Sequence, residues 1–427
     1  MRKINTTGGQ ALLIAMIFFL FASMTAILGF ARPVIKQIAF ASNLQDSVSS
    51  IYLTEGLTED LVYRMKNSLS IDSSETLTIG SNSANATITS VGGNQEIEII
   101  ANVDGAVRKQ KIDLQVGIGV AFNFGVHAGE GGVLFTNSGG SIAGNLFSNG
   151  PVVGQNNFID GEVIAAGPNG LVDDIHASSS IFSHTIKNSQ IDKDAYYQVI
   201  SNTLVNGNSY PGSEDLATST LPITDEMVDA WKADALAGGL TDCASQGTFI
   251  IDSDVTIGPQ KYNCDVTIKK NNTNVVLGGS IWVEGDIIFE NAPLISIHPS
   301  LGDESVVIVA DNPSDSQNSG NILVKNNTEF AGNTGTFVLL LSQNDSAENG
   351  GGNNAIDIDN NILGDVLVYA GHGTIEMENN ANLKEVTGYK IIIKNNAQVI
   401  YDTGLASLLF TSGPGGGYEI QSWDEIE

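Results

Sequence analysis

The sequence predicts a mainly β protein that begins with one long α-helix. Residues 11–30 form an uninterrupted apolar run. Short apolar segments separated by Gly and Asn follow from about residue 120, and after residue 247 a phrase that ends in an Asn turn recurs. These observations predict a transmembrane helix, a small β-hairpin region and a right-handed parallel β-helix with an α-containing insertion.

The apolar run ALLIAMIFFLFASMTAILGF contains no charged residue. At about 1.5 Å per residue it spans about 30 Å, the thickness of the hydrocarbon core of a bilayer. Arg2 and Lys3 precede it and the first acidic residue is Asp46, which predicts a cytoplasmic N-terminus and an external C-terminal part. A cleaved signal peptide is the alternative, because residues 39–41 (AFA) have the small-x-small pattern of a cleavage site.

A second helical segment follows the apolar run. Apolar residues recur mostly at three- to four-residue steps, at Leu44, Val48, Ile51, Leu57, Leu61 and Met65. Pro33 lies between the two segments and lacks an amide donor, so we expect a bend there. One continuous helix over residues 10–66 and two separate helices both fit this pattern.

The domain organisation follows from these segments. We expect a basic leader over residues 1–9, a helix over 10–70, a β-hairpin region over 75–119 and a β-helix domain over 120–427. An insertion at about 171–246 would interrupt the last of these. It holds a predicted helix from Thr224 to Leu236, with acidic residues in its first turn.

The composition indicates an extracellular protein. The formal net charge is −29, from 48 acidic and 19 basic residues, which disfavours binding to nucleic acid phosphates. Charged residues make up only 16% of the chain, and Asn, Ser, Thr and Gly take their place. The two cysteines, Cys243 and Cys264, are predicted to form a disulfide, with two buried free thiols as the alternative.

The clearest hairpin signal is Asp104-Gly105 between two alternating segments. Asp-Gly supplies the positive φ angles of a two-residue turn. The register that this turn implies places Ile97 opposite Ile112, Glu98 opposite Lys111 and Glu96 opposite Asp113. The second of these pairs is electrostatically favourable and the third is unfavourable.

The Asn-containing phrases predict stacked turns of a β-helix. Examples are VKNNT at residues 324–328, MENNA at 377–381 and IKNNA at 393–397. Asn tolerates the left-handed conformation that tight corners need, and stacked Asn amides hydrogen-bond to one another. An antiparallel β-sandwich with Asn-rich turns is the alternative.

The N-terminal residues resemble a known family. A basic leader ending in Gly8-Gly9 is followed by QALLI at residues 10–14, and later by IYLTEGLTEDLVYR at 51–64. This arrangement resembles the N-terminal region of PilX-type minor pilins and related type IV pilus assembly proteins. The resemblance implies that a prepilin peptidase cuts after Gly9, so that the mature chain begins at Gln10 and its helix packs among those of other subunits.

The sequence departs from most pilins at one position. The family usually has a Glu at the fifth mature position, where this chain has Ile14, or Leu13 if the cut follows Gly8. The resemblance therefore implies a minor, tip or membrane-retained role rather than a repeating shaft. Residues 250–427 are similar to the β-helical domain that often follows PilX-type N-termini, through residues 387–402 and the tail that contains Trp423.

The candidate catalytic and metal-binding residues also fit structural roles. Asp357, Asp359 and Asp365 have the hard oxygen ligands that Ca²⁺ prefers, but alternation of Asp357 and Asp359 with Ile356 and Ile358 favours an exposed strand face. The histidines lack a metal-ligand spacing such as His-Glu-x-x-His; they are His127, His176, His184, His298 and His372. His372, in Gly371-His372-Gly373, fits a turn. We expect no catalytic residue, metal or cofactor.

The sequence thus favours a non-enzymatic surface protein, a minor subunit or adhesin of a type IV pilus-like apparatus. Its expected location is a single-pass membrane position with an extracytoplasmic C-terminal domain, at the cell surface or in a pilus. Expected partners are the membrane, other pilin-like subunits, the prepilin peptidase and a surface glycan or protein ligand. The alternative is a membrane-anchored β-helix that binds or cleaves a polysaccharide, because β-helices also host such enzymes.

Overall fold

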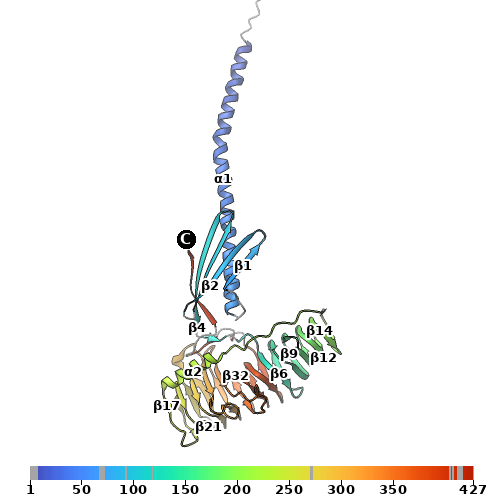
Figure 1. The fold of residues 1–427 in the computed structure, drawn as a ribbon, viewed down its shortest axis with the longest axis vertical. Coiled ribbons are helices and arrows are strands. Elements are labelled where there is room, and N and C mark those ends of the chain that lie inside the picture. The colour runs from blue at the N-terminus through green and yellow to red at the C-terminus, as the bar shows by residue number, and fades with distance from the viewer. Residues whose placement is uncertain are drawn as a thin grey trace, which may run out of the picture. The chain divides into compact units, whose positions relative to one another are not determined.

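The computed structural model describes residues 8–66, 73–91, 94–117, 119–120, 122–269, 273–402, 405, 408–410 and 417–426. The chain divides into two compact units, the first comprising Met1–Gln115 with Tyr418–Glu427 and the second Val116–Gly417. The protein is mainly β, with a long apolar helix at its N-terminus (Figure 1).

The first unit begins with helix α1 (Gly8–Lys66), a single helix of 59 residues that includes Pro33. The prediction of one continuous helix is thereby confirmed and that of two separate helices is wrong. At about 1.5 Å per residue the helix is about 88 Å long.

An antiparallel sheet accompanies α1 in the first unit. Its strands follow the order β1-β2-β3-β4-β37. Their bounds are β1 (Ser74–Ile79), β2 (Asn82–Val91), β3 (Asn94–Val103), β4 (Ala106–Gly117) and β37 (Gly417–Ile426). The last strand of the chain therefore completes a sheet that the first part of the chain begins.

The register predicted for the hairpin is confirmed. β3 and β4 pair Ile97 with Ile112, Glu98 with Lys111 and Glu96 with Asp113. The ion pairs differ from the expectation, because Lys111 Nζ lies 2.7 Å from Glu96 and 3.7 Å from Asp113. A diagonal lysine thus compensates the two carboxylates that were expected to repel each other. Hydrogen bonding to Glu96 is the main cause that raises the pKa of Lys111.

The C-terminal half of α1 packs on this sheet. Leu53, Leu57 and Leu61 are buried against Ile97, Ile99, Ile112 and Leu114. Two hydroxyls on the same helix face bind the sheet: Ser50 Oγ donates to Ala101 O at 3.1 Å, and Thr58 Oγ1 to Gln110 Oε1 at 3.0 Å. The apolar stripe expected from the sequence is therefore partly wrong, because Leu44 and Val48 are exposed and small hydroxyl residues share the buried face. The side chain of Met65 lies outside the described part.

The second unit consists of short strands in two runs separated by a helix. The first run comprises β5 (Gly119–Val120), β6 (Val126–Phe135), β7 (Ser141–Ala143), β8 (Leu146–Ser148), β9 (Val152–Asp160), β10 (Val163–Ala165), β11 (Leu171–Ala177), β12 (Ile181–Lys187), β13 (Gln190–Ile191), β14 (Ala195–Ser201), β15 (Leu204–Val205) and β16 (Ser209–Pro211). Helix α2 (Asp225–Gly238) follows, as predicted for this position.

The second run returns from α2 toward the C-terminus. It comprises β17 (Leu240–Thr241), β18 (Thr248–Ile251), β19 (Val255–Ile257), β20 (Gln260–Tyr262), β21 (Asp265–Lys269), β22 (Asn274–Leu277), β23 (Ile281–Val283), β24 (Ile287–Glu290), β25 (Leu294–Ile297), the 3-10 turn η1 (Pro299–Leu301), β26 (Val306–Ala310), β27 (Ile322–Val324), β28 (Glu329–Ala331), β29 (Val338–Ser342), β30 (Asn354–Ile358), β31 (Leu363–Gly364), β32 (Val366–Met377), β33 (Asn382–Leu383), β34 (Glu385–Ile393), β35 (Gln398–Ile400) and β36 (Leu408–Leu409).

Apart from β5 and β36, which pair with each other antiparallel, these strands stack in parallel, with apolar positions above their counterparts in the next turn of the chain. One column of paired residues runs Ile268, Phe289, Val324, Ile358, Met377 and Ile393. Val324, Met377 and Ile393 are the first residues of the Asn-containing phrases VKNNT, MENNA and IKNNA. The parallel pairing contradicts the antiparallel sandwich. Six of these strands also close a parallel ring in the order β6, β8, β10, β12, β11 and β9. The ring closes because the first half of β6 pairs with β8 and its second half with β9, and because the first half of β12 pairs with β10 and its second half with β11.

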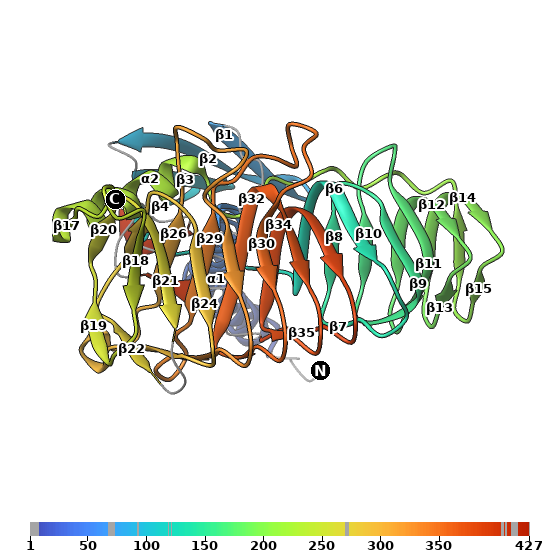
Figure 2. The same cartoon turned by 90° about the horizontal axis from the view of Figure 1, so that it is seen from below.

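The order of the stack differs from the order of the chain. β34 pairs with β6, so that Ile393 lies beside Phe135. The chain therefore enters the stack at its middle, runs out to β16, crosses to β17 at the other end and returns (Figure 2). The prediction of an insertion at about 171–246 is wrong for residues 171–211, because strands β11–β16 in this range belong to the stack. Successive turns in this part are only 14 residues long, which is the spacing between the paired residues Ile181, Ala195 and Ser209. The Asn-pair phrase does not occur in these turns.

The predicted disulfide is present. Cys243 and Cys264 are bonded, with their Cα atoms 5.5 Å apart. Thr241 pairs with Tyr262, and Cys243 and Cys264 each lie two residues after one of these paired residues. The disulfide therefore joins the first turn to the second at the end of the stack where β17 lies. Both side chains are buried.

Asn pairs form the corners of the stack, as predicted. Eight of these Asn residues have φ angles between 46° and 63°: Asn326, Asn327, Asn360, Asn361, Asn379, Asn380, Asn395 and Asn396. Their amides also bond along the stack: Asn361 Nδ2 donates to Asn327 Oδ1 at 3.2 Å, and Asn380 Nδ2 to Asn361 Oδ1 at 3.3 Å. The corresponding Asn271 and Asn272 lie outside the described residues.

Two substitutions at Asn361 separate its conformational role from its amide bonds. Gly adopts φ near +60° without strain but lacks both hydrogen bonds, whereas Ala lacks the bonds and is also strained. We expect Asn361→Ala to lower the free energy of unfolding by about 1 kcal/mol more than Asn361→Gly does. Urea unfolding of both variants measures the difference. Equal losses in the free energy of unfolding for the two variants would show that the left-handed conformation of the corner is not the reason for Asn at this position.

Candidate functional site

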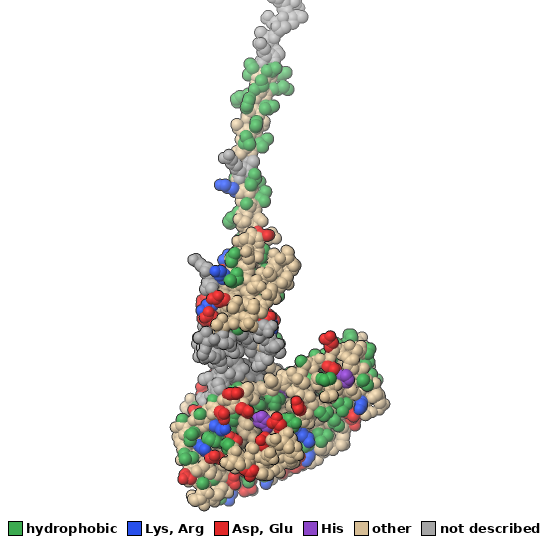
Figure 3. Space-filling view, viewed as in Figure 1, with side chains coloured by type: hydrophobic (Ala, Val, Ile, Leu, Met, Phe, Trp, Pro, Cys, Tyr) green, Lys and Arg blue, Asp and Glu red, His purple; other side chains and the backbone are tan. Residues whose placement is uncertain are grey.

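The apolar half of α1 is the first candidate site. Large apolar side chains are exposed along it, and Figure 3 shows one face of them; they are Leu12, Leu13, Ile14, Met16, Ile17, Phe18, Phe19, Leu20, Phe21, Met24, Ile27, Leu28, Val34, Ile35, Ile38 and Phe40. Among the described residues, one helix is long and apolar enough to cross a membrane by length and composition. One face of its C-terminal half, by contrast, packs on the sheet of the first unit. The helix thus divides into an uncovered apolar half and a packed half.

The proposed processing site lies at the start of this helix. Gly9 and Gln10 are within the described length of α1, which begins at Gly8. Their side chains and residues 1–7 lie outside what the structure describes. Cleavage between Gly9 and Gln10 stays a prediction.

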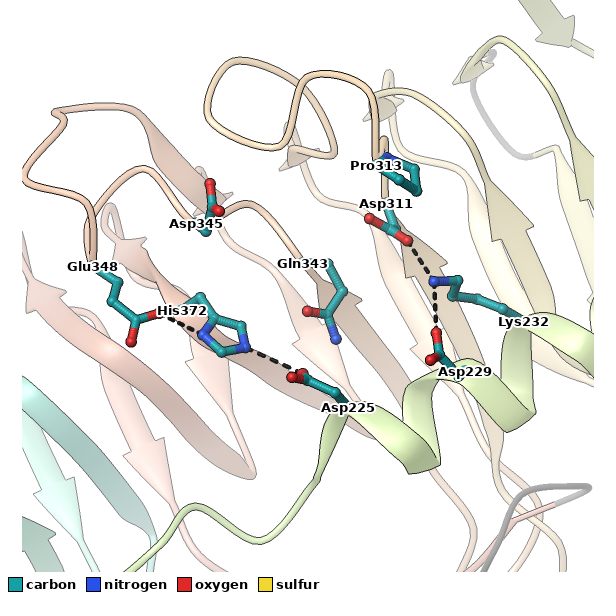
Figure 4. Close-up of a pocket in the computed structure, with 9 residues that line it drawn as sticks. All are labelled: Asp225, Asp229, Lys232, Asp311, Pro313, Gln343, Asp345, Glu348 and His372. Carbon is teal, nitrogen blue, oxygen red and sulfur yellow. Dashed lines mark hydrogen bonds and ion pairs between the residues drawn. The ribbon is translucent and has the colours of Figure 1, made fainter.

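The second candidate is a cavity of about 390 Å³ between α2 and the stack (Figure 4). It is lined by Asp225, Asp229, Lys232, Asp311, Pro313, Gln343, Asp345, Glu348 and His372. Five carboxylates face two basic side chains, so the cavity is acidic. Asp225, Asp229 and Lys232 lie on one face of α2, at a spacing of four and then three residues, a signal that was present in the sequence.

His372 joins α2 to the stack across this cavity. Its Nε2 lies 3.2 Å from Asp225 Oδ1 and its Nδ1 lies 2.6 Å from Glu348 Oε2. Both ring nitrogens therefore face carboxylate oxygens, an arrangement that a doubly protonated imidazolium satisfies. The turn expected at His372 is in fact a register shift within β32, between Ala370 and Thr374.

Lys232 makes a second connection between α2 and the stack. Its Nζ lies 2.9 Å from Asp229 and 2.7 Å from the buried Asp311. Nζ also lies 5.2 Å from the ring centroid of Trp282, whose Nε1 donates to Asp311 O at 3.3 Å. Burial lowers the pKa of Lys232, but Asp311 and Asp229 outweigh this and raise it overall. Two ion pairs, Lys232–Asp311 and His372–Asp225, thus join α2 to the stack across the cavity, and the cavity is in large part the attachment site of α2.

The His372 bridge makes the attachment of α2 depend on pH. Burial lowers the pKa of His372, but the hydrogen bonds and charges of Asp225 and Glu348 outweigh burial and raise that pKa above its usual value. The bridge therefore stabilises fully below about pH 6.5, and this contribution is lost as the pH rises through the raised pKa.

We expect hydrogen exchange in the first turns of α2 to become several-fold faster between about pH 6 and about pH 9, after correction for the intrinsic rate. His372→Gln should remove this extra dependence, and His298→Gln, whose ring contacts Ser300, should keep it. An unchanged pH dependence in His372→Gln would contradict the bridge.

The residues considered for Ca²⁺ are held by separate partners. Asp357 Oδ1 accepts from Asn354 Nδ2 at 2.7 Å, Asp359 Oδ1 from Asn379 Nδ2 at 2.8 Å, and Asp365 Oδ2 from Gly332 N at 3.3 Å. Ile356 and Ile358 point into the core, as the alternation suggested. No group of three or more His, Cys, Asp or Glu side chains in the described part is arranged to hold a metal ion.

The other histidines lie apart from one another in the second unit. His127 is buried beside Phe124 and Phe147, and burial lowers its pKa to about 4. His176 contacts Asp192 at 3.2 Å and His184 contacts Asp215 at 2.9 Å. These pairs tie neighbouring segments together, and the sequence alone did not indicate them.

No protein-family model matches the sequence, and no curated protein matches it. Among solved structures, the chain is similar to the competence-associated pilin ComZ from Thermus thermophilus, with 11% identity over 89% of this chain and 97% of that chain. The TM-score is 0.27, and at that score the likeness carries no argument about fold or function.

Proposed function

We propose that this chain is a pilin-like, membrane-anchored surface protein, a non-enzymatic minor subunit or adhesin of a type IV pilus-like apparatus. The observation that carries the proposal is the division of α1. One half exposes apolar side chains all round, and the other packs on an antiparallel sheet. The first half suits a lipid or the helices of other subunits, since apolar surface of this extent is unfavourable in water.

The second unit supports an external location. Its disulfide is stable in oxidising compartments. We further propose that the parallel stack is a right-handed β-helix with a polar outer surface that presents a surface glycan or protein ligand site. Parallel pairing of successive turns and inward apolar columns support this assignment.

Leader processing is the first test. We expect the intact mass of the protein from its native membranes to correspond to a chain that begins at Gln10. A Gly9→Leu variant should keep the leader, and the matched Gly8→Ala variant should still lose it. A native protein that retains Met1 would argue against processing by a prepilin peptidase.

Association with filaments is the second test. Shearing cells and collecting the filaments should bring the protein down with them if it is a minor subunit. Its complete retention in the membrane fraction would instead favour an anchored protein that does not enter filaments. Reducing-sugar release from a glycan panel by the purified protein, lost on Asp357→Asn or Asp359→Asn, would contradict a non-enzymatic role.

A further inference from the structure

Glu385 is a buried carboxyl group on the outer side of the stack. It lies in β34 beside Val386, which points into the core, so the side chain of Glu385 points away from the core. β34 lies between β32 and β6 (Figure 2). The row of paired residues that leads to it is apolar and fully buried: Val307, Leu339 and Leu367 precede Glu385 on successive strands. An acidic side chain thus occupies the next position in an apolar row.

This carboxyl group has a single hydrogen bond. Thr387 Oγ1 donates to Glu385 Oε1, whereas Oε2 has no partner among the described residues. Both side chains are 0% exposed. A carboxylate buried in this way lacks the partners that offset the loss of hydration, so the group is neutral while it is buried. Burial accordingly raises the pKa of Glu385 well above its usual value.

Two segments of the chain cover this side of the stack. β5 and β36 pair with each other, Val120 opposite Leu408, and Phe122 N donates to Leu405 O at 3.1 Å. The apolar side chains of these segments are buried in the same cluster as Leu367. We call them the cover: Val120, Phe122, Leu405, Leu408 and Phe410.

Two tyrosines lie beside Glu385. Burial is the main cause that raises the pKa of Tyr369 and of Tyr401, and the charge of Glu385 contributes to both shifts. The Tyr401 hydroxyl donates to Phe122 O at 2.6 Å, which ties this side chain to the cover. Asp402 also raises the pKa of Tyr401. These neighbours are neutral or acidic, so they do not stabilise an ionised Glu385.

The histidine on the next strand does not supply a charge either. His127 of β6 pairs with Thr387. Burial lowers the pKa of His127 to about 4, so its ring is neutral above that pH. Thr387 is the one side chain in the described part of the chain that stabilises the ionised form of Glu385.

We propose that Glu385 is a pH-sensitive latch on the cover, which stays closed while Glu385 carries a proton and opens as that proton is lost. A carboxylate is stable where water reaches it, so ionisation favours the state in which the cover is displaced. The closed state keeps a proton that the open state releases above about pH 4. The contribution of Glu385 to closure is therefore complete below about pH 4 and is lost as the pH rises through the raised pKa of the closed state.

The cover lies where the second unit continues into the rest of the chain. β4 precedes β5, β37 follows β36, and both β4 and β37 belong to the sheet of the first unit. Opening of the cover would free both of these connections and expose the outer faces of Leu367 and Tyr369 to water. The inference concerns the second unit alone and holds whether or not α1 enters a filament.

Hydrogen exchange of the full-length protein in detergent tests the latch. Between about pH 5 and about pH 8 we expect exchange at the Phe122 and Leu405 amides to become at least about tenfold faster, after correction for the intrinsic rate. Glu385→Gln keeps the size of the side chain but cannot ionise, so it should abolish this increase. Glu329→Gln, at an exposed carboxylate in β28, should keep it. No increase in the native chain, or an increase that persists in Glu385→Gln, would overturn the proposal.

The His372 bridge also weakens as the pH rises, and a second variant separates the two effects. In His372→Gln, exchange at Phe122 and Leu405 should still accelerate with pH, because Glu385 is intact. Loss of the acceleration in this variant would assign it to the attachment of α2 and would overturn the latch.

Thermal unfolding gives an independent measurement. The melting temperature of Glu385→Gln relative to that of the native chain should rise by several degrees between about pH 5 and about pH 8, because only the native chain must keep a proton to stay closed. A difference in melting temperature that is the same at both pH values would contradict the proposal.

Discussion

Phe289→Ala is expected to lower the free energy of unfolding of the second unit by about 3–5 kcal/mol, the range for large-to-small changes in a core. Phe289 is fully buried in β24 and pairs with Ile268 on one side and Val324 on the other. Its ring meets Phe330 edge to face, with centroids 5.7 Å apart. Strand spacing is fixed by main-chain hydrogen bonds, so neighbouring turns cannot close the cavity.

Phe158→Ala is the matched control for this prediction. Phe158 lies in β9 of the same unit but is 43% exposed, so its loss should cost less than about 1 kcal/mol. Denaturant unfolding of both variants, followed by circular dichroism, gives the comparison. Similar costs for the two substitutions would mean that the inward columns do not form the core.

Trp231→Ala is the second substitution with a large expected effect, also about 3–5 kcal/mol. Trp231 is 1% exposed on α2, and its ring lies 5.3 Å from that of Phe410. It belongs to a separate apolar cluster that covers the outer side of the stack, with Leu339, Leu341 and Leu367 beneath it. We expect α2 to loosen first, since the cluster is distinct from the core inside the stack.

Hydrogen exchange locates this effect. In Trp231→Ala, protection should be lost over residues 225–238 while β24 and β27 stay protected. Trp423→Ala, at a tryptophan that is 42% exposed in β37, should leave α2 unaffected. Uniform loss of protection throughout the second unit would contradict an independent attachment of α2.

Local patterns in the sequence predicted much of the fold. The Asp104-Gly105 turn determines its own register, so Ile97 was correctly placed opposite Ile112. Asn pairs are suited to left-handed corners, and the corners at Asn360 and Asn379 have that conformation. Both features depend on neighbouring residues, which is why they are visible in the sequence.

The order of the stack and the cavity depend on contacts between distant residues. Ile393 lies beside Phe135, and His372 contacts Asp225, 147 residues earlier in the chain. No local periodicity specifies which turn lies next to which when the chain enters a stack at its middle. The 14-residue turns of β12–β16 lack the Asn-pair phrase, so the sequence pattern predicts an insertion where the structure has strands of the stack.

Fractionation of cells that make the native protein tests membrane anchoring most directly. After washing with alkaline carbonate, the protein should stay in the membrane pellet, with Cys243 and Cys264 resistant to alkylation until they are reduced. Recovery of the full-length chain in the soluble cytosolic fraction, with both thiols free, would contradict a membrane-anchored surface protein.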